Sequence, residues 1–135
     1  MDIKEKELEL FCSQNKINKE HMCIVGSHLL QKLNIRLSND IDFILTTNER
    51  NRLKLPKHHK TCGQYIEIVS QNWHPTISDD ILIKNSDYHT VMQNGFKICN
   101  LQMLIERKQK QNREKDIRDL NLIKNYFSDS AHSVA

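Results

Sequence analysis

The chain has 135 residues, of which 38% are hydrophobic and 27% charged, as in a globular domain with a single core. Its net charge of +3 permits a phosphate-bearing partner without requiring one. No stretch approaches the ~20 apolar residues of a membrane-spanning helix, and the N-terminal segment has no apolar signal core. We therefore expect no membrane partner, a cytoplasmic location, one domain over residues 1–127 and a frayed tail over residues 128–135.

The first predicted element is an amphipathic helix over residues 3–15, in which apolar side chains recur among Lys and Glu. We expect this helix to cover one side of a sheet, with an apolar face that includes an isoleucine, a leucine, a phenylalanine and a cysteine. These residues are Ile3, Leu8, Phe11 and Cys12.

A strand, a tight turn, a helix and a second strand are predicted next. The apolar run 22–25 ends at Gly26-Ser27, a helical pattern covers residues 27–34, and a second apolar run covers residues 40–45. Glycine lets a backbone approach a ligand closely. Ser27 can cap the helix or bond a phosphate oxygen, because a helix N-terminus attracts anions.

Two acids share one face of the second strand. Asp40 and Asp42 are two residues apart, so their side chains point the same way. At ~5 Å and an effective dielectric of ~20 they repel by ~3 kcal/mol, and a bound cation would relieve that repulsion.

Residues 46–62 are the least regular part of the chain. Residues 50–60 contain five cations and no acid, and Pro56 ends any helix that begins before it. We expect a solvated helix and loop. The alternative is a basic rim for an acidic acceptor or a nucleic-acid backbone, although no aromatic residue is interleaved there to stack on bases.

A third acid follows in the β-rich run 65–69, where Glu67 has isoleucine on either side. If this strand pairs beside the strand with Asp40 and Asp42, Glu67 comes within ~5–8 Å of them. Three carboxylates suit hard divalent ions. We expect two Mg²⁺ ions, with Mn²⁺ as the alternative metal.

A hairpin is predicted over residues 88–99, because Asn94-Gly95 favours a type I′ turn between two apolar runs. It could extend the sheet beyond Glu67. Before it, Asp79 and Asp80 are expected to start a helix.

A C-terminal helix is predicted over residues 101–111, followed over residues 113–127 by a second helix or a continuation of the first. On spacing alone, Arg113 with Asp116 and Lys115 with Asp119 form surface ion pairs. The expected inward residues are Leu101, Leu104 and Ile105 in the first helix, and Ile117, Leu120, Ile123 and Phe127 in the second.

Four of these segments, in this order, resemble the nucleotidyltransferase superfamily that includes DNA polymerase β-like enzymes, especially its small bacterial members. The segments Val25-Gly26-Ser27, Asp40-Ile41-Asp42 and Ile66-Glu67-Ile68 carry the resemblance. The lead-in Arg36-x-Ser38 and the segment Lys108…Arg113-x-Lys115-Asp116-x-x-Asp119 are similar to those of lincosamide- and aminoglycoside-type nucleotidyltransferases and related bacterial toxin proteins. The resemblance covers about residues 22 to 127.

The resemblance implies an α/β fold, with a small mixed sheet flanked by helices and C-terminal helices after the hairpin. It implies that Asp40, Asp42 and Glu67 are catalytic and hold the metal. It also reverses the ion-pair interpretation for part of the C-terminal segment, which would border the nucleotide. The implied nucleotide-binding residues are Gly26, Ser27, Lys108, Arg113 and Asp116.

The implied activity is metal-dependent transfer of a nucleoside monophosphate from an NTP, ATP in the first place, to a hydroxyl acceptor, with a small molecule favoured. One alternative is a catalytically weak or inactive nucleotide-binding partner of regulatory or antitoxin type. Another is nucleotide addition to RNA or protein. A homodimer could supply the acceptor pocket that a single small domain has little room for.

Overall fold

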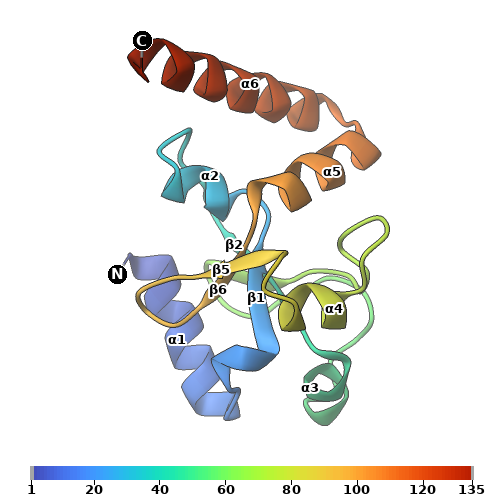
Figure 1. Cartoon of the computed structure of the whole chain (residues 1–135). Coiled ribbons are helices and arrows are strands. Elements are labelled where there is room, and N and C mark those ends of the chain that lie inside the picture. The colour runs from blue at the N-terminus through green and yellow to red at the C-terminus, as the bar shows by residue number, and fades with distance from the viewer. Residues whose placement is uncertain (1, 135) are drawn as a thin grey trace.

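A computed structural model describes the backbone of residues 2–134 and the side chains of residues 2–129. Helices and strands are mixed along the chain (Figure 1). The helices are α1 (Ile3–Asn15), α2 (His28–Lys32), α3 (Thr47–Arg52), α4 (Asp79–Lys84), α5 (Leu101–Gln111) and α6 (Glu114–Val134), with a 3₁₀ turn η1 (Lys19–His21). The strands are β1 (Met22–Val25), β2 (Ile41–Leu45), β3 (Lys60–Thr61), β4 (Ile66–Ile68), β5 (His89–Val91) and β6 (Lys97–Cys99). Among the described residues, no helix is both long and apolar enough to cross a membrane.

The strands form one open, mixed six-stranded sheet in the order β3-β4-β2-β1-β6-β5. β2 runs antiparallel to β1 and parallel to β4, while β1 runs parallel to β6. Every residue of β1 is buried, which requires cover on both faces of the sheet. Helices α2, α5 and α6 gather at one end of the molecule and α1, α3 and α4 at the other (Figure 1). The predicted α/β class with a small mixed sheet is confirmed.

The predicted hairpin is present, but not where we expected it. β5 and β6 pair antiparallel, and β6 joins β1 through Ile24 and Ile98, so the hairpin lies across the sheet from Glu67. β3 is the neighbour of β4 instead. The type I′ turn is also wrong: that turn needs two residues with positive φ, and Gly95 has φ +88° while Asn94 does not have a positive φ.

Helix α1 turns a mixed face inward. Leu8 and Cys12 are buried as predicted, but Ile3 is 64% exposed and Glu5 only 1%. The buried carboxylate of Glu5 has enough polar partners to replace water. It pairs with His28 and Lys32 of α2 and accepts a hydrogen bond from Asn94.

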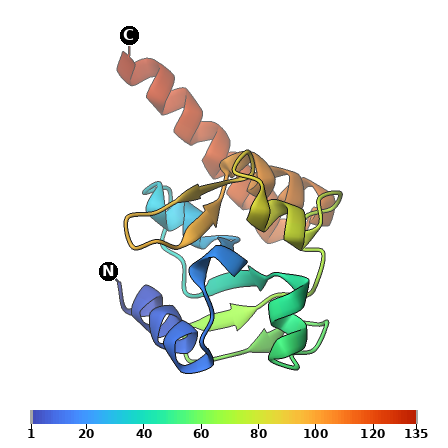
Figure 2. The ribbon, with the colours of Figure 1, turned by 60° about the horizontal axis from the view of Figure 1, so that its bottom comes forward.

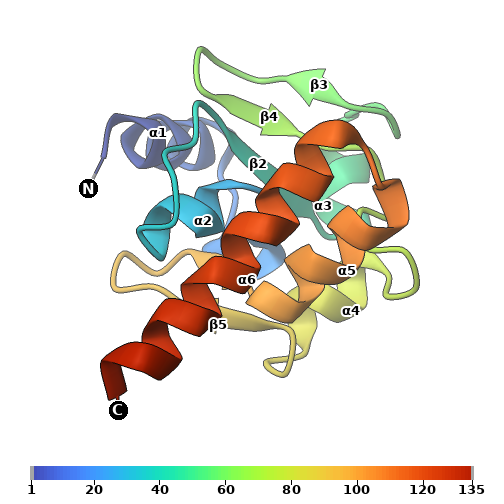
Figure 3. The ribbon, with the colours of Figure 1, turned by 90° about the horizontal axis from the view of Figure 1, so that it is seen from above.

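Helix α6 lies beside α5 (Figure 3) and projects beyond the rest of the chain (Figure 2). It continues to Val134, past the end that we expected at Phe127. Ile123 is buried as predicted, whereas Ile117 and Phe127 are about half exposed. Asp116 and Asp119 are buried in their place, because α6 packs against cations.

Arg50 is not solvated, in contrast to the solvated helix and loop that we expected for residues 46–62. Its side chain is buried, with 1% exposed. The guanidinium donates to the backbone carbonyls of Pro56 at 2.6 Å, His58 at 3.0 Å and Val69 at 3.0 Å. Arg50 thereby holds the basic loop against the end of β4, and the loop's other cations remain exposed.

Replacing Arg50 with methionine is expected to lower the free energy of unfolding by about 3 kcal/mol, because three carbonyls lose a charged donor. The matched control is Arg52→Met. The Arg52 side chain is 44% exposed, pairs with Glu49 at 2.7 Å and donates to the Asn15 carbonyl at 3.0 Å. Because such exposed interactions contribute little to stability, its loss should cost much less than that of Arg50. Urea denaturation of both variants measures the difference. Similar values for the two variants would contradict a structural role for Arg50.

Candidate metal and nucleotide site

Asp42 and Glu67 lie side by side on neighbouring strands. In the parallel pair of β2 and β4, Asp42 is directly opposite Glu67. Residues opposite each other in adjacent strands project from the same face. The strand pairing that would bring these acids together is therefore confirmed, as is their common side of the sheet.

The Gly26-Ser27 turn lies on the other side of Asp42, because Val25 of β1 pairs with Asp42. Gly26 has φ +78°, and a Cβ there would lie 3.0 Å from Asp42 Oδ2, so a larger residue would crowd the carboxylate. Ser27 is the N-cap residue of α2 but makes no side-chain capping bond. Its Oγ instead accepts a hydrogen bond from Arg36 Nη2 at 2.9 Å, so of the two roles open to Ser27 the side-chain capping bond is not formed.

The Asp42 carboxylate is electrostatically unfavourable in its charged form. Burial raises its pKa first, and the nearby charges of Glu67 and Asp40 raise it further, to about 6. A divalent cation would reverse this balance, since an opposite charge within a few ångströms favours the carboxylate form. Carboxylate oxygens are the ligands that a hard cation such as Mg²⁺ prefers, and Gly26 leaves room for the Asp42 carboxylate.

Asp40 is more exposed than the other two acids and precedes the first residue of β2. Its backbone carbonyl accepts a bond from Ser38 Oγ at 2.9 Å. Among the described residues, Asp40, Asp42 and Glu67 do not place one carboxylate oxygen each within 4.8 Å of one another. Asp2, Glu5 and His28 do bring two carboxylate oxygens and a ring nitrogen within that distance elsewhere. The three predicted metal ligands share a region without converging on a single point.

These acids line an open cavity of about 580 Å³, within the ~300–1,000 Å³ typical of small-molecule sites. The Gly26-Ser27 turn and the acid-bearing strands form part of its wall, and α5 and α6 contribute cations. All eight residues proposed from the sequence line this cavity: Gly26, Ser27, Asp40, Asp42, Glu67, Lys108, Arg113 and Asp116.

Two cations of the cavity wall, Lys108 of α5 and Arg113 just before α6, are already paired. Arg113 Nε lies 2.7 Å from Asp116 Oδ2, as spacing alone predicted. Lys108 is 6% exposed. Its Nζ lies 2.8 Å from Asp119 Oδ2 and 3.6 Å from Asp116 Oδ1. Lys108 is therefore part of a buried ion-pair network and does not face the cavity as an isolated charge.

Asp119 pairs with Arg36, 83 residues away, and not with Lys115 as predicted. Arg36 Nε and Nη2 donate to its two carboxylate oxygens at 2.7 and 2.8 Å. Burial raises the pKa of Asp119, but the hydrogen bonds from Arg36 and Lys108 outweigh burial and hold the pKa below its ordinary value. Through Arg36, helix α6 is connected to Ser27 and the Gly-Ser turn.

Sequence reasoning missed several residues of the cavity wall. His59 Nε2 lies 2.9 Å from Glu67 Oε2. Arg107 lies over the Trp73 ring at 5.8 Å and donates to its carbonyl. No motif marks these side chains; the only signal was the place of His59 within the basic segment.

No family model, curated protein or solved structure matches this chain. The fold and the cavity define a mixed α/β protein with a carboxylate cluster beside a glycine turn and a layer of ion-paired cations. Function is inferred from this geometry.

Proposed function

We propose that the chain is a metal-dependent nucleotidyltransferase with the corresponding fold. It would move a nucleoside monophosphate from an NTP, with ATP favoured, to an acceptor hydroxyl. The observation that carries this proposal is that Asp42 lies opposite Glu67 on one side and beside Gly26, just after the end of β1, on the other. That arrangement combines a close-approach turn for phosphate with carboxylates for divalent ions in one cavity.

Asp40, Asp42 and Glu67 are the residues that would hold the metal, two Mg²⁺ ions or Mn²⁺ in their place. Their spread favours two ions over one, because they do not converge within 4.8 Å. The cavity lining has as many acidic as basic side chains, so the protein alone provides no excess of positive charge for a polyphosphate. When bound, the metal neutralises phosphate charge and lowers the pKa of the acceptor hydroxyl.

The chain's own residues bind the phosphates and take the proton. Ser27 Oγ accepts from Arg36, which leaves the hydroxyl hydrogen free to donate to a phosphate oxygen. Glu67 takes the proton of the acceptor hydroxyl. The hydroxyl oxygen forms a bond to the α-phosphorus, the bond between that phosphorus and the α–β bridging oxygen breaks, and pyrophosphate leaves.

A small-molecule acceptor is favoured over RNA or protein. Trp73, the tryptophan of the cavity wall, is 3% exposed, and exposed aromatic residues are what single-stranded nucleic acids stack on. The basic segment 50–60 has exposed cations, such as Lys57 and Lys60, so nucleotide addition to RNA stays an outcome of the test.

A second candidate is nucleotide binding without turnover, as in a regulatory partner. One observation favours it: Arg36, Lys108 and Arg113 already pair with Asp116 and Asp119. A triphosphate would have to share these cations with carboxylates, which weakens the charge stabilisation that phosphoryl transfer needs.

Pyrophosphate release from labelled ATP, with Mg²⁺ or Mn²⁺ and a panel of small-molecule hydroxyls, RNA and protein acceptors, tests the proposal. We expect release with at least one acceptor, and loss of release in Glu67→Gln. Binding of Mg²⁺-ATP without release for any acceptor would support the second candidate. No ATP binding by the native chain would refute both.

A further inference from the structure

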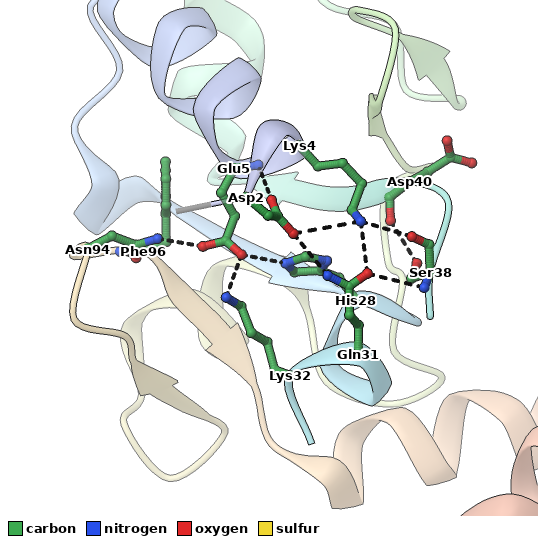
Figure 4. A network of polar contacts seen from close by, with 10 residues as sticks. All are labelled: Asp2, Lys4, Glu5, His28, Gln31, Lys32, Ser38, Asp40, Asn94 and Phe96. Carbon is green, nitrogen blue, oxygen red and sulfur yellow. Dashed lines mark hydrogen bonds and ion pairs between the residues drawn. The ribbon is translucent and has the colours of Figure 1, made fainter. Parts of the chain in front are cut away.

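Two side chains of α1 hold the starts of the two acid-bearing strands. Lys4 and Glu7 are three residues apart and so lie on one face of the helix. Lys4 Nζ donates to the backbone carbonyl of Ser38 at 2.9 Å and to Gln31 Oε1 at 2.8 Å. Figure 4 shows Lys4 reaching across to Gln31 and Ser38, just before Asp40.

The turn before β2 is fixed by this contact. Gln31 Oε1 also accepts from the Ser38 backbone N–H at 3.2 Å, and Ser38 Oγ donates to the Asp40 carbonyl at 2.9 Å. Lys4 and Ser38 are each at least partly buried. The backbone that leads into Asp40 and Asp42 is therefore tied to the first turn of α1.

Glu7 ties the backbone that leads into β4 to the same helix. Its carboxylate accepts from the backbone N–H groups of Gln64 at 3.0 Å and Tyr65 at 2.7 Å, immediately before Ile66. A Cβ on Gly63 would lie 2.6 Å from Glu7 Oε1. Glycine at position 63 is thus what leaves room for the carboxylate against the turn.

The contacts of Lys4 and Glu7 lie at the N-terminal ends of two neighbouring strands, β2 and β4. β2 and β4 are parallel, so both begin beside α1, which packs against β4. Their starts are also joined directly, because Ile41 N donates to the Tyr65 carbonyl at 2.7 Å. One helix therefore fixes the strand that carries Asp42 relative to the strand that carries Glu67.

We propose that Lys4 and Glu7 are positioning residues for the metal site, which set the separation of Asp42 and Glu67. This inference rests on the proposed function. Two like-charged carboxylates on adjacent strands repel each other, so an unheld pair would move apart before the cation arrives. Preorganised ligands bind a metal more tightly, since the cost of bringing them together has already been met in folding.

Glu5, on the same helix, provides a contrasting role. Its carboxylate faces α2 and the β5–β6 hairpin, with partners His28 at 2.9 Å, Lys32 at 2.5 Å and Asn94 at 2.7 Å (Figure 4). None of these partners lies at the start of β2 or β4. Glu5→Gln should therefore destabilise the protein without loosening the starts of β2 and β4.

The test measures Mn²⁺ affinity of the full chain by electron paramagnetic resonance, without nucleotide. Lys4→Met and Glu7→Gln are expected to bind Mn²⁺ about tenfold more weakly, at the lower end of the effect of residues that orient metal ligands. Gly63→Ala should have the same effect, because it displaces Glu7. Amide hydrogen exchange at Gln64 and Tyr65 should speed up in Glu7→Gln and in Gly63→Ala.

The charge-matched controls are Lys6→Met and Glu9→Gln on the same helix, which should retain native Mn²⁺ affinity. Native affinity in Lys4→Met and Glu7→Gln would overturn the inference while leaving the proposed function intact. So would an affinity loss in every variant, Lys6→Met and Glu9→Gln included, that follows the loss of thermal stability. A native chain that binds no Mn²⁺ would overturn both the proposed function and the inference.

Discussion

Asp42→Asn is expected to weaken Mg²⁺-ATP binding by at least about 100-fold and, in the absence of metal, to stabilise the protein. The first effect follows from removing the charge of the carboxylate that lies between Gly26 and Glu67, since proteins usually hold Mg²⁺ through only one or two carboxylates together with substrate phosphates. The second follows from its pKa, which burial, Glu67 and Asp40 raise to about 6. An amide in this position carries no charge to desolvate and does not repel Glu67.

The stabilisation has a defined pH dependence. A carboxylate with a raised pKa holds its proton more tightly when folded, so native stability falls as the pH rises from 3.8 to about 6. The cost is complete above that range. At 1.36 kcal/mol per pH unit, and with allowance for the partial exposure of Asp42, Asn should stabilise the metal-free protein by about 2 kcal/mol at pH 7.5. The gain should vanish near pH 4.

Calorimetric titration with Mg²⁺-ATP measures the first effect, and urea denaturation in EDTA between pH 4 and pH 7.5 measures the second. Asp87→Asn, at an exposed carboxylate, is the control and should change neither. Equal Mg²⁺-ATP affinity in native protein and Asp42→Asn would remove Asp42 from the metal site. If Asp42→Asn were less stable than the native chain at pH 7.5, the claim that the charged Asp42 carboxylate destabilises the metal-free protein would be wrong.

The arrangement of the acids could be predicted because it depends on local alternation. A strand's period of two places Asp40 and Asp42 on one face. The same alternation places Glu67 on the less buried face of its strand, because Ile66 and Ile68 on either side of it are buried. Which strands become neighbours is not local information. The β5–β6 hairpin pairs with β1, whereas the short exposed strand β3 pairs with β4. Packing between residues distant in sequence decides which strands become neighbours.

The ion pairs of the cavity wall show the same limit. Helical periodicity assigned Ile117 and Phe127 to the inward face of α6, but Asp116 and Asp119 are buried there. Their partners Arg36 and Lys108 belong to other elements, so no local pattern could choose between an apolar and an acidic face. Arg50 was misassigned for a similar reason, since its acceptors are backbone carbonyls of a loop that Pro56 makes irregular.

Asp119→Asn is expected to lower the free energy of unfolding by about 3 kcal/mol at pH 7, because Lys108 and Arg36 lose a shared, buried carboxylate. The pH dependence is opposite to that of Asp42. Hydrogen bonds hold the pKa of Asp119 below its ordinary value of 3.8, so its contribution is present above pH 3.8 and is lost as the pH falls below that. The difference between variant and native protein should therefore persist at pH 5 and shrink only in stronger acid.

The same variant distinguishes two roles for α6 in nucleotide binding. If Asp119 orients Arg36 and hence Ser27, its loss should weaken Mg²⁺-ATP binding, and we expect a reduction of about tenfold. If the Asp119 carboxylate instead competes with the triphosphate for Arg36 and Lys108, its loss should strengthen binding. Asp129→Asn, at an exposed site on α6, is the control. Tighter binding in Asp119→Asn would make α6 an inhibitory element and would contradict the orienting role, because a single carboxylate cannot both hold these cations for the phosphates and be displaced by them.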